Sequence, residues 1–133
     1  MEDRELYRQA KAVLNRAYAP YSGFRVGAAL LTKEGRVFTG VNVENSSYGA
    51  TICAERVAVG KAISDGFREF EAIAVASSEG KAWPCGICRQ FLYEFNTNLR
   101  VITGIDAEHL ECCTLKELLA CGFRLSAEQS GLQ

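Results

Sequence analysis

The first eighteen residues carry apolar side chains at helical spacing. One face of this segment is apolar, and it is formed by Leu6, Ala10, Val13, Leu14 and Ala17. A residue that precedes proline avoids the helical conformation, and Pro20 places this restriction on Ala19. The pattern therefore predicts a helix that ends near Tyr18.

Short apolar runs separated by turn residues predict strands. Residues 26–32 form a nearly continuous apolar run, and residues 37–43 alternate. Because only a short turn with Gly35 separates these two runs, they are predicted to form a hairpin. Three later runs are predicted to be strands at 72–76, 101–105 and 110–113.

Further helices are predicted between these strands. Thr51 is the expected cap of a helix that reaches Ile63, and another helix is expected over 86–95. Thr114 and Glu117 have the spacing of a capping box, which predicts a short last helix. The resulting order predicts an α/β fold, a three-layer α/β/α arrangement around a mixed five-stranded sheet. Residues 1–133 are expected to form a single domain, with a frayed tail at 126–133.

Composition and charge narrow the function classes. Hydrophobic residues make up 48% and charged residues 23% of the 133, which is typical of a folded globular domain. Fifteen Lys and Arg against sixteen Asp and Glu give a net charge of −1, so nucleic acid and anionic membranes are not expected partners. The charged N-terminus and the lack of a long apolar run predict a cytoplasmic protein. Six cysteines in a reducing compartment favour metal ligands, catalytic groups or core residues over disulfides.

Three of these cysteines have the spacing of a metal site. Cys53 opens one predicted helix, and Cys85 and Cys88 open another. Two cysteines three apart in a helical turn can bind one metal, and zinc takes thiolates in a tetrahedral array. Three protein ligands, one fewer than a structural zinc normally has, are typical of a catalytic zinc that also binds water. Glu55 lies in the same first turn as Cys53, where a carboxylate can serve as general acid and base without ligating the metal.

These motifs resemble a known family. Cys53-Ala54-Glu55 followed by Pro84-Cys85-Gly86-Ile87-Cys88 is similar to the signature of the zinc nucleobase deaminases. Further ordered matches resemble the small, single-domain, homotetrameric cytidine deaminases, over residues 6–123, and they lie at 18–28, 40–45, 47–49 and 53–56.

The resemblance implies a fold, an activity and a set of roles. It implies a cytidine-deaminase-like fold, one zinc ion per subunit, and hydrolysis of free cytidine and deoxycytidine to uridine and deoxyuridine with release of ammonia, as in pyrimidine salvage. Glu55 would move protons, and a homotetramer would share its sites between subunits. The implied substrate contacts are Phe24 on the base, Ala54 on the pyrimidine edge, Asn42 and Glu44 on the ribose 3′-hydroxyl, Tyr48 on the 5′-hydroxyl across an interface, and Phe123 in a neighbouring subunit's site.

The chain departs from the family pattern at several positions. Cys53 stands where many deaminases have histidine, and three thiolates around zinc give a net charge of −1. Two helix N-termini are expected to offset that charge, and Arg56 and Arg89 are expected to hydrogen-bond the sulfurs. Ser46 replaces a common alanine, and residues 120–122 replace a common Pro-Gly-like turn before Phe123.

Other interpretations remain open. Cys85 and Cys88 taken alone also fit a redox pair or half a zinc ribbon. A non-enzymatic zinc module would recruit a fourth ligand, such as Cys121, and would give Glu55 no role. A polynucleotide editor would need a basic track that the net charge disfavours, and a blasticidin S deaminase would share the zinc motifs. The remaining thiols, Cys112, Cys113 and Cys121, are expected in the core.

Overall fold

The protein folds around one five-stranded sheet. The computed structural model describes residues 1–125, and the tail predicted to fray lies outside them. The strand order is β2-β1-β3-β4-β5. β3 and β4 are parallel and the other neighbours are antiparallel, which confirms the predicted mixed sheet. The strands are β1 (Val26–Thr32), β2 (Val37–Val41), β3 (Phe70–Ser77), β4 (Arg100–Asp106) and β5 (His109–Thr114).

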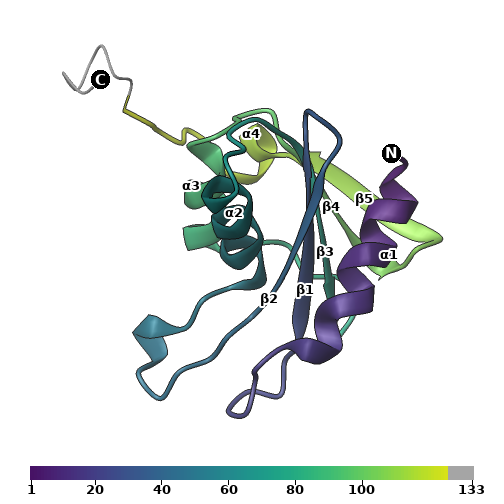
Figure 1. Ribbon diagram of the computed structural model, residues 1–133, viewed down its shortest axis with the longest axis vertical. Helices are drawn as coiled ribbons and strands as arrows, with labels where there is room; N and C mark the ends of the chain where they lie inside the picture. Colours follow the sequence, from purple (N-terminus) through teal and green to yellow (C-terminus); the bar gives the residue numbers. More distant parts are fainter. Residues whose placement is uncertain (126–133) are drawn as a thin grey trace.

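Helices cover both faces of this sheet, as Figure 1 shows. α1 (Asp3–Val13) lies on one face, and α2 (Ala54–Ser64), α3 (Gly86–Tyr93) and α4 (Leu115–Leu118) lie on the other. The predicted three-layer α/β/α arrangement is therefore confirmed. The capping box of Thr114 and Glu117 is present at the start of α4. Among residues 1–125, no helix is both long enough and apolar enough to span a membrane.

The two central strands form the core because they are covered on both sides. β1 and β3 are almost wholly buried, which explains why their sequences are continuous apolar runs rather than alternating ones. On the α2 side the core contains Leu30, Ile73, Leu92 and Val101, and on the α1 side it contains Leu6, Ala10, Leu31 and Ile102.

Two predicted helix boundaries are wrong, and contacts outside the helices explain both. The first helix ends at Val13, and a 3-10 turn follows over Leu14–Arg16. Tyr18 is drawn into extended pairing, because its N–H donates to the carbonyl of Asn42 and its own carbonyl accepts from Glu44.

The second helix is capped by Cys53 and not by Thr51. Ile52 is still paired with Val43 in an isolated bridge, so the chain stays extended up to Cys53. The Thr51 hydroxyl instead accepts a hydrogen bond from the backbone of Asn45 at 3.2 Å.

The prediction that the three remaining cysteines lie in the core is also wrong. Cys112 and Cys121 are exposed and Cys113 is half-buried. β5 is an edge strand with polar, solvent-facing positions, and Cys121 lies in a turn at a φ of 55°. Being small and apolar does not bury a thiol when its element lies at the rim of the fold.

One glycine sets the distance between β2 and α2. A methyl group on Gly40 would lie 2.5 Å from the carbonyl oxygen of Ala54 and 2.5 Å from the backbone nitrogen of Ala58. Both of those atoms belong to the helix backbone, which cannot yield as a flexible side chain does. Gly40 therefore allows the first turn of α2, which carries Cys53 and Glu55, to pack directly on the sheet.

We expect Gly40→Ala to lower the free energy of unfolding by about 1–3 kcal/mol, because it overpacks the contact between β2 and α2. Gly60→Ala in α2 is the matched control, since a methyl group there meets no atom within 4 Å. The control should leave stability unchanged or raise it by up to about 1 kcal/mol, the helix propensity difference. Urea denaturation at one fixed protein concentration measures both, and equal effects of the two substitutions would contradict this account.

Candidate metal centre

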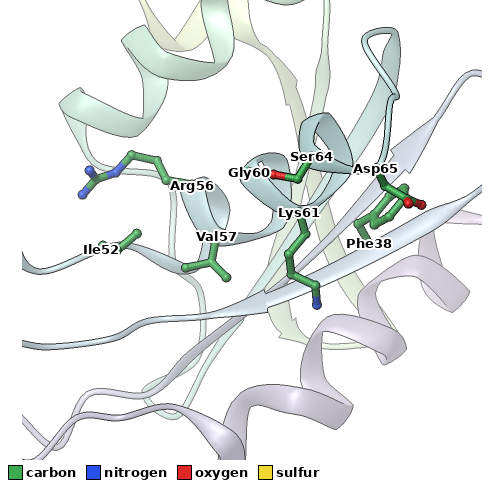
Figure 2. A pocket seen from close by; sticks show the side chains of 8 residues that line it. All are labelled: Phe38, Ile52, Arg56, Val57, Gly60, Lys61, Ser64 and Asp65. Carbon is green, nitrogen blue, oxygen red and sulfur yellow. The ribbon is translucent and has the colours of Figure 1, made fainter.

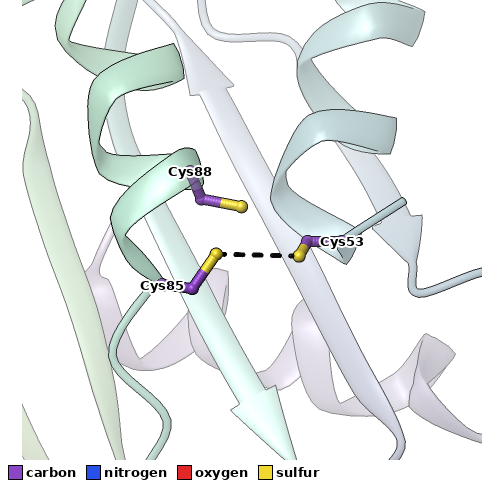
Figure 3. A group of neighbouring side chains, drawn as sticks. All are labelled: Cys53, Cys85 and Cys88. Carbon is purple, nitrogen blue, oxygen red and sulfur yellow. Dashed lines mark hydrogen bonds between the residues drawn. The ribbon is translucent and has the colours of Figure 1, made fainter. Parts of the chain in front are cut away.

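Two helix starts bring three cysteines together. Cys53 is the N-cap residue of α2 and Cys85 is the N-cap residue of α3, both in extended conformation. Cys88 lies in the first turn of α3. Figure 3 shows the three side chains pointing into the space between these two helices. The free N–H groups of both helix starts direct partial positive charge toward the sulfurs.

The spacing of the sulfurs fits a tetrahedral metal. All three Sγ atoms lie within 4.8 Å of one another, and those of Cys53 and Cys85 are 3.9 Å apart. Zinc–sulfur bonds of about 2.3 Å in a tetrahedral array imply a sulfur–sulfur separation of roughly 3.8 Å. Among residues 1–125, no other cysteine, histidine or carboxylate brings a ligand atom into this group. The donor set therefore suits zinc with three protein ligands.

Arg56 provides a positive charge beside the sulfurs. Its Nη2 lies 3.7 Å from the Sγ of Cys53 and 3.2 Å from the carbonyl oxygen of Thr51. Its Nε is buried and has no hydrogen-bond partner among the described residues. A guanidinium in this position is stabilised by negative charge on the sulfurs, so its surroundings also fit a thiolate cluster.

The pKa values of Cys53 and Cys88 depend on each other. A hydrogen bond from the Cys88 thiol, followed by those from Arg56 and Cys85, lowers the pKa of Cys53 to about 5. That same hydrogen bond, together with burial, holds the pKa of Cys88 well above its usual range. A thiolate is therefore available at neutral pH, and it is the form that binds metal.

Glu55 is a buried acid beside these sulfurs. Only 4% of its surface is exposed, in the first turn of α2. Burial is the main reason why the pKa of its carboxyl rises to about 7, and the nearby Cys53 thiolate adds to the rise. A carboxyl with a pKa near neutrality can both accept and donate a proton at physiological pH.

A small cavity adjoins the sulfurs and the acid. Its volume is about 180 Å³, and it brings together five of the predicted site residues with Cys53, namely Phe24, Asn42, Ala54, Glu55 and Cys85. No site role was predicted for its other lining residues, which are Val26, Thr51, Val75, Ala82 and Trp83. Only Trp83 had a signal in the sequence, because it lies next to Pro84 and the predicted metal loop.

Asn42 and Glu44 are both engaged in protein contacts. The amide of Asn42 accepts from the backbone of Val26 at 2.9 Å and donates to the carbonyl of Phe24 at 2.8 Å. The Glu44 carboxylate receives hydrogen bonds from the loop at residues 21–22, which lower its pKa. Glu44 lines a second hollow of about 340 Å³ beside the first, together with Tyr48, and Thr51 borders both.

Tyr48, Arg89 and Phe123 are among the predicted residues that do not line the cavity of their own chain. Tyr48 and Phe123 have exposed fractions of 78% and 68%, and neither lines the 180 Å³ cavity. Arg89 donates to the carbonyls of Pro84 at 2.7 Å and Leu118 at 2.8 Å. The expected contact between Arg89 and a sulfur is not among the hydrogen bonds of residues 1–125, so this arginine braces the loop that carries Cys85.

A wider hollow lies on the outer side of α2 and contains none of the three sulfurs. It has a volume of about 660 Å³, and Figure 2 shows its lining, which includes Phe38, Ile52, Val57 and Lys61. Its walls are mainly apolar, and it holds no buried acid and no pair of thiols. We therefore place the candidate chemistry in the smaller cavity, where the sulfurs and Glu55 meet.

Comparisons with known proteins agree with this geometry. The family model described as "cytidine and deoxycytidylate deaminase zinc-binding region" matches residues 1–105. A cytidine deaminase of Sporosarcina psychrophila is 45% identical over 126 residues, which cover 92% of each chain. The crystal structure of cytidine deaminase from Burkholderia pseudomallei has a TM-score of 0.87 and 44% identity, and the match covers 92% of this chain and 100% of that one.

A less similar relative has a different name. A blasticidin-S deaminase of Bacillus cereus is 28% identical over 127 residues, which cover 89% of each chain. The family model spans most of the 133 residues, and the cytidine deaminase relatives match across nearly their whole length. On these grounds the chain belongs to the cytidine and deoxycytidylate deaminase family, a family with a zinc-binding region.

Proposed function

We propose that this protein hydrolyses free cytidine and deoxycytidine to uridine and deoxyuridine, releasing ammonia, and that it serves pyrimidine salvage. The observation that carries this proposal is the buried Glu55 carboxyl beside three convergent sulfurs, at the wall of a small cavity. Residues 1–133 would form one catalytic domain with one zinc ion per subunit, held by Cys53, Cys85 and Cys88. Its proposed location is the cytoplasm, where free thiols such as these six stay reduced.

Glu55 is proposed to move the protons of the reaction. When bound in such a site, zinc acts as a Lewis acid that makes water nucleophilic at neutral pH. A carboxylate at Glu55 would accept a proton from that water. It would deliver that proton to N3 of the pyrimidine, and it would then transfer the second proton, from the hydroxyl group newly formed at C4, to the departing amino group, which leaves as ammonia. The pKa of about 7 suits a group that is deprotonated and reprotonated in one turnover.

Residues of the cavity and of the adjoining hollow are proposed to hold the nucleoside. The ring of Phe24 would pack against the pyrimidine, and the backbone of Ala54 would contact its polar edge. Asn42 and Glu44 would bind the 3′-hydroxyl, which both donates and accepts hydrogen bonds. Each has capacity left, because the Asn42 amide has a second N–H and the Glu44 carboxylate has further lone pairs.

Other subunits are proposed to complete the site in a homotetramer. Tyr48 would reach a neighbour's 5′-hydroxyl and Phe123 a neighbour's cavity, which gives a reason for two large aromatic side chains to be exposed. The apolar hollow on α2 supports burial between copies (Figure 2). The net charge of −1 supports a small-molecule substrate over nucleic acid or a membrane.

We expect Glu55→Gln to abolish deamination while zinc remains bound at one equivalent. The amide keeps the shape of the side chain but does not transfer protons. Loss of cytidine absorbance and metal analysis on the same sample measure the two effects. The comparison variant Cys85→Ser should lose the metal itself. Full activity of Glu55→Gln would refute the proposed role of Glu55, whereas wild-type protein that binds zinc and deaminates no nucleoside would favour a non-enzymatic zinc module.

Replacement of Arg56 by alanine should keep the fold and lower turnover by about ten- to hundredfold, the size typical for residues that support metal ligands. The physical reason is the loss of positive charge beside the Cys53 sulfur. Arg8→Ala, on the exposed side of α1, is the control and should not change turnover. An unchanged turnover number in zinc-loaded Arg56→Ala would contradict this role.

Site sharing predicts complementation between two inactive variants. Co-expressed Glu55→Gln and Phe123→Ala chains should form mixed oligomers in which some sites combine an intact Glu55 with a neighbour's intact Phe123. Activity should then exceed the sum of the separately purified variants several-fold. If Phe123 serves the site of its own chain, mixing will restore nothing.

The choice of substrate distinguishes the two activities for which the relatives are named, deamination of cytidine and deamination of blasticidin S. The protein should deaminate cytidine and deoxycytidine in preference to blasticidin S. Parallel assays on the three compounds measure this preference, and activity on blasticidin S alone would overturn the proposed substrate.

A further inference from the structure

The hydroxyl of Ser22 lies between two residues of the proposed substrate site. It donates a hydrogen bond to Oε2 of Glu44 and accepts one from the backbone N–H of Phe24 at 3.0 Å. Ser22 lies in the stretch 18–28 that resembles the family, but neither that resemblance nor the proposed function gives it a role. Both hydrogen-bond partners of this hydroxyl, Glu44 and Phe24, are proposed to contact the nucleoside.

The Phe24 contact determines where the Ser22 proton points. A hydroxyl has one proton and two lone pairs, and the N–H of Phe24 occupies a lone pair. The proton is then free to point toward the Glu44 carboxylate. Phe24 cannot move away easily, because its carbonyl accepts from the Asn42 amide at 2.8 Å.

Backbone groups fix the other carboxylate oxygen. The N–H groups of Tyr21 and Ser22 donate to Oε1 of Glu44 at 2.9 and 3.1 Å. The turn that follows is possible because Gly23 adopts a φ of +70°. With both oxygens held, the half-buried Glu44 side chain has one defined orientation.

We infer that Ser22 is a positioning residue, which orients the Glu44 carboxylate so that it receives the 3′-hydroxyl of the nucleoside. This inference rests on the proposed function. The proton and one lone pair of the Ser22 hydroxyl are already engaged within the loop, so Ser22 has no proton left to donate to the sugar. Its effect acts through Glu44 and therefore depends on the sugar hydroxyl that Glu44 binds.

The test compares Ser22→Ala on two substrates that differ in one hydroxyl. With cytidine, Ser22→Ala should lower kcat/KM by about ten- to hundredfold, mainly through KM, as expected for a lost hydrogen bond to a charged group. With 3′-deoxycytidine, which lacks the hydroxyl, Ser22→Ala and wild type should differ by less than about twofold. Deoxycytidine keeps the 3′-hydroxyl and should behave like cytidine.

Two further variants control for damage to the loop. Ser22→Thr keeps a hydroxyl and should restore activity to within about threefold of wild type. Ser46→Ala makes the same chemical change nearby, but its hydroxyl pairs with Tyr21 at 2.7 Å and not with Glu44, so it should have no effect. Equal losses of Ser22→Ala on both substrates, or no loss on cytidine, would overturn the inference alone. Wild-type protein that leaves cytidine unchanged would overturn the proposed function and this inference with it.

Discussion

The structure depends on holding three sulfur atoms close together at the ends of two helices. Thiolates repel one another, and here they also lie beside a buried acid. Two helix N-termini and the Arg56 guanidinium offset part of that charge, and a divalent metal would offset the rest. The negative charge of Cys53 also contributes to the raised pKa of Glu55, so the sulfurs and the acid interact electrostatically.

The strand order of the sheet brings those two helix starts together. α2 follows the β1–β2 hairpin and α3 follows β3, yet β1 and β3 are hydrogen-bonded neighbours at the centre of the sheet. Gly40 lets α2 approach the sheet at the turn that carries Cys53. Burial of both central strands makes this platform rigid, as a site with sub-ångström requirements needs.

Local patterns were enough to predict most of the fold and the centre of the site. Apolar patterns located the strands and the first helix, and a capping box located the last one. The spacing of Cys53, Cys85, Cys88 and Glu55 located the group that the structure brings together. The errors arose where contacts between residues distant in the sequence determine the local structure. The bridge between Val43 and Ile52 moves the cap of α2 from Thr51 to Cys53, and no residue near Thr51 signals that pairing.

The residues around the edge of the site were harder to predict because no regular spacing in the sequence marks them. Ser22 reaches Glu44 across twenty-two positions of loop and strand, and Arg89 binds two backbone carbonyls that any sequence would offer. The role implied for the exposed Phe123 lies in the site of another subunit. Residues that act through hydrogen bonds between loops are therefore identified only from the three-dimensional structure. Three metal ligands at helix starts can be identified from the sequence.

X-ray absorption at the zinc edge of the purified protein tests the central claim most directly. Three sulfur neighbours at about 2.3 Å and a fourth, lighter neighbour are the predicted first coordination shell. Four sulfur neighbours would mean that the polypeptide closes the site, and the account of a catalytic centre built on Cys53, Cys85 and Cys88 would be wrong.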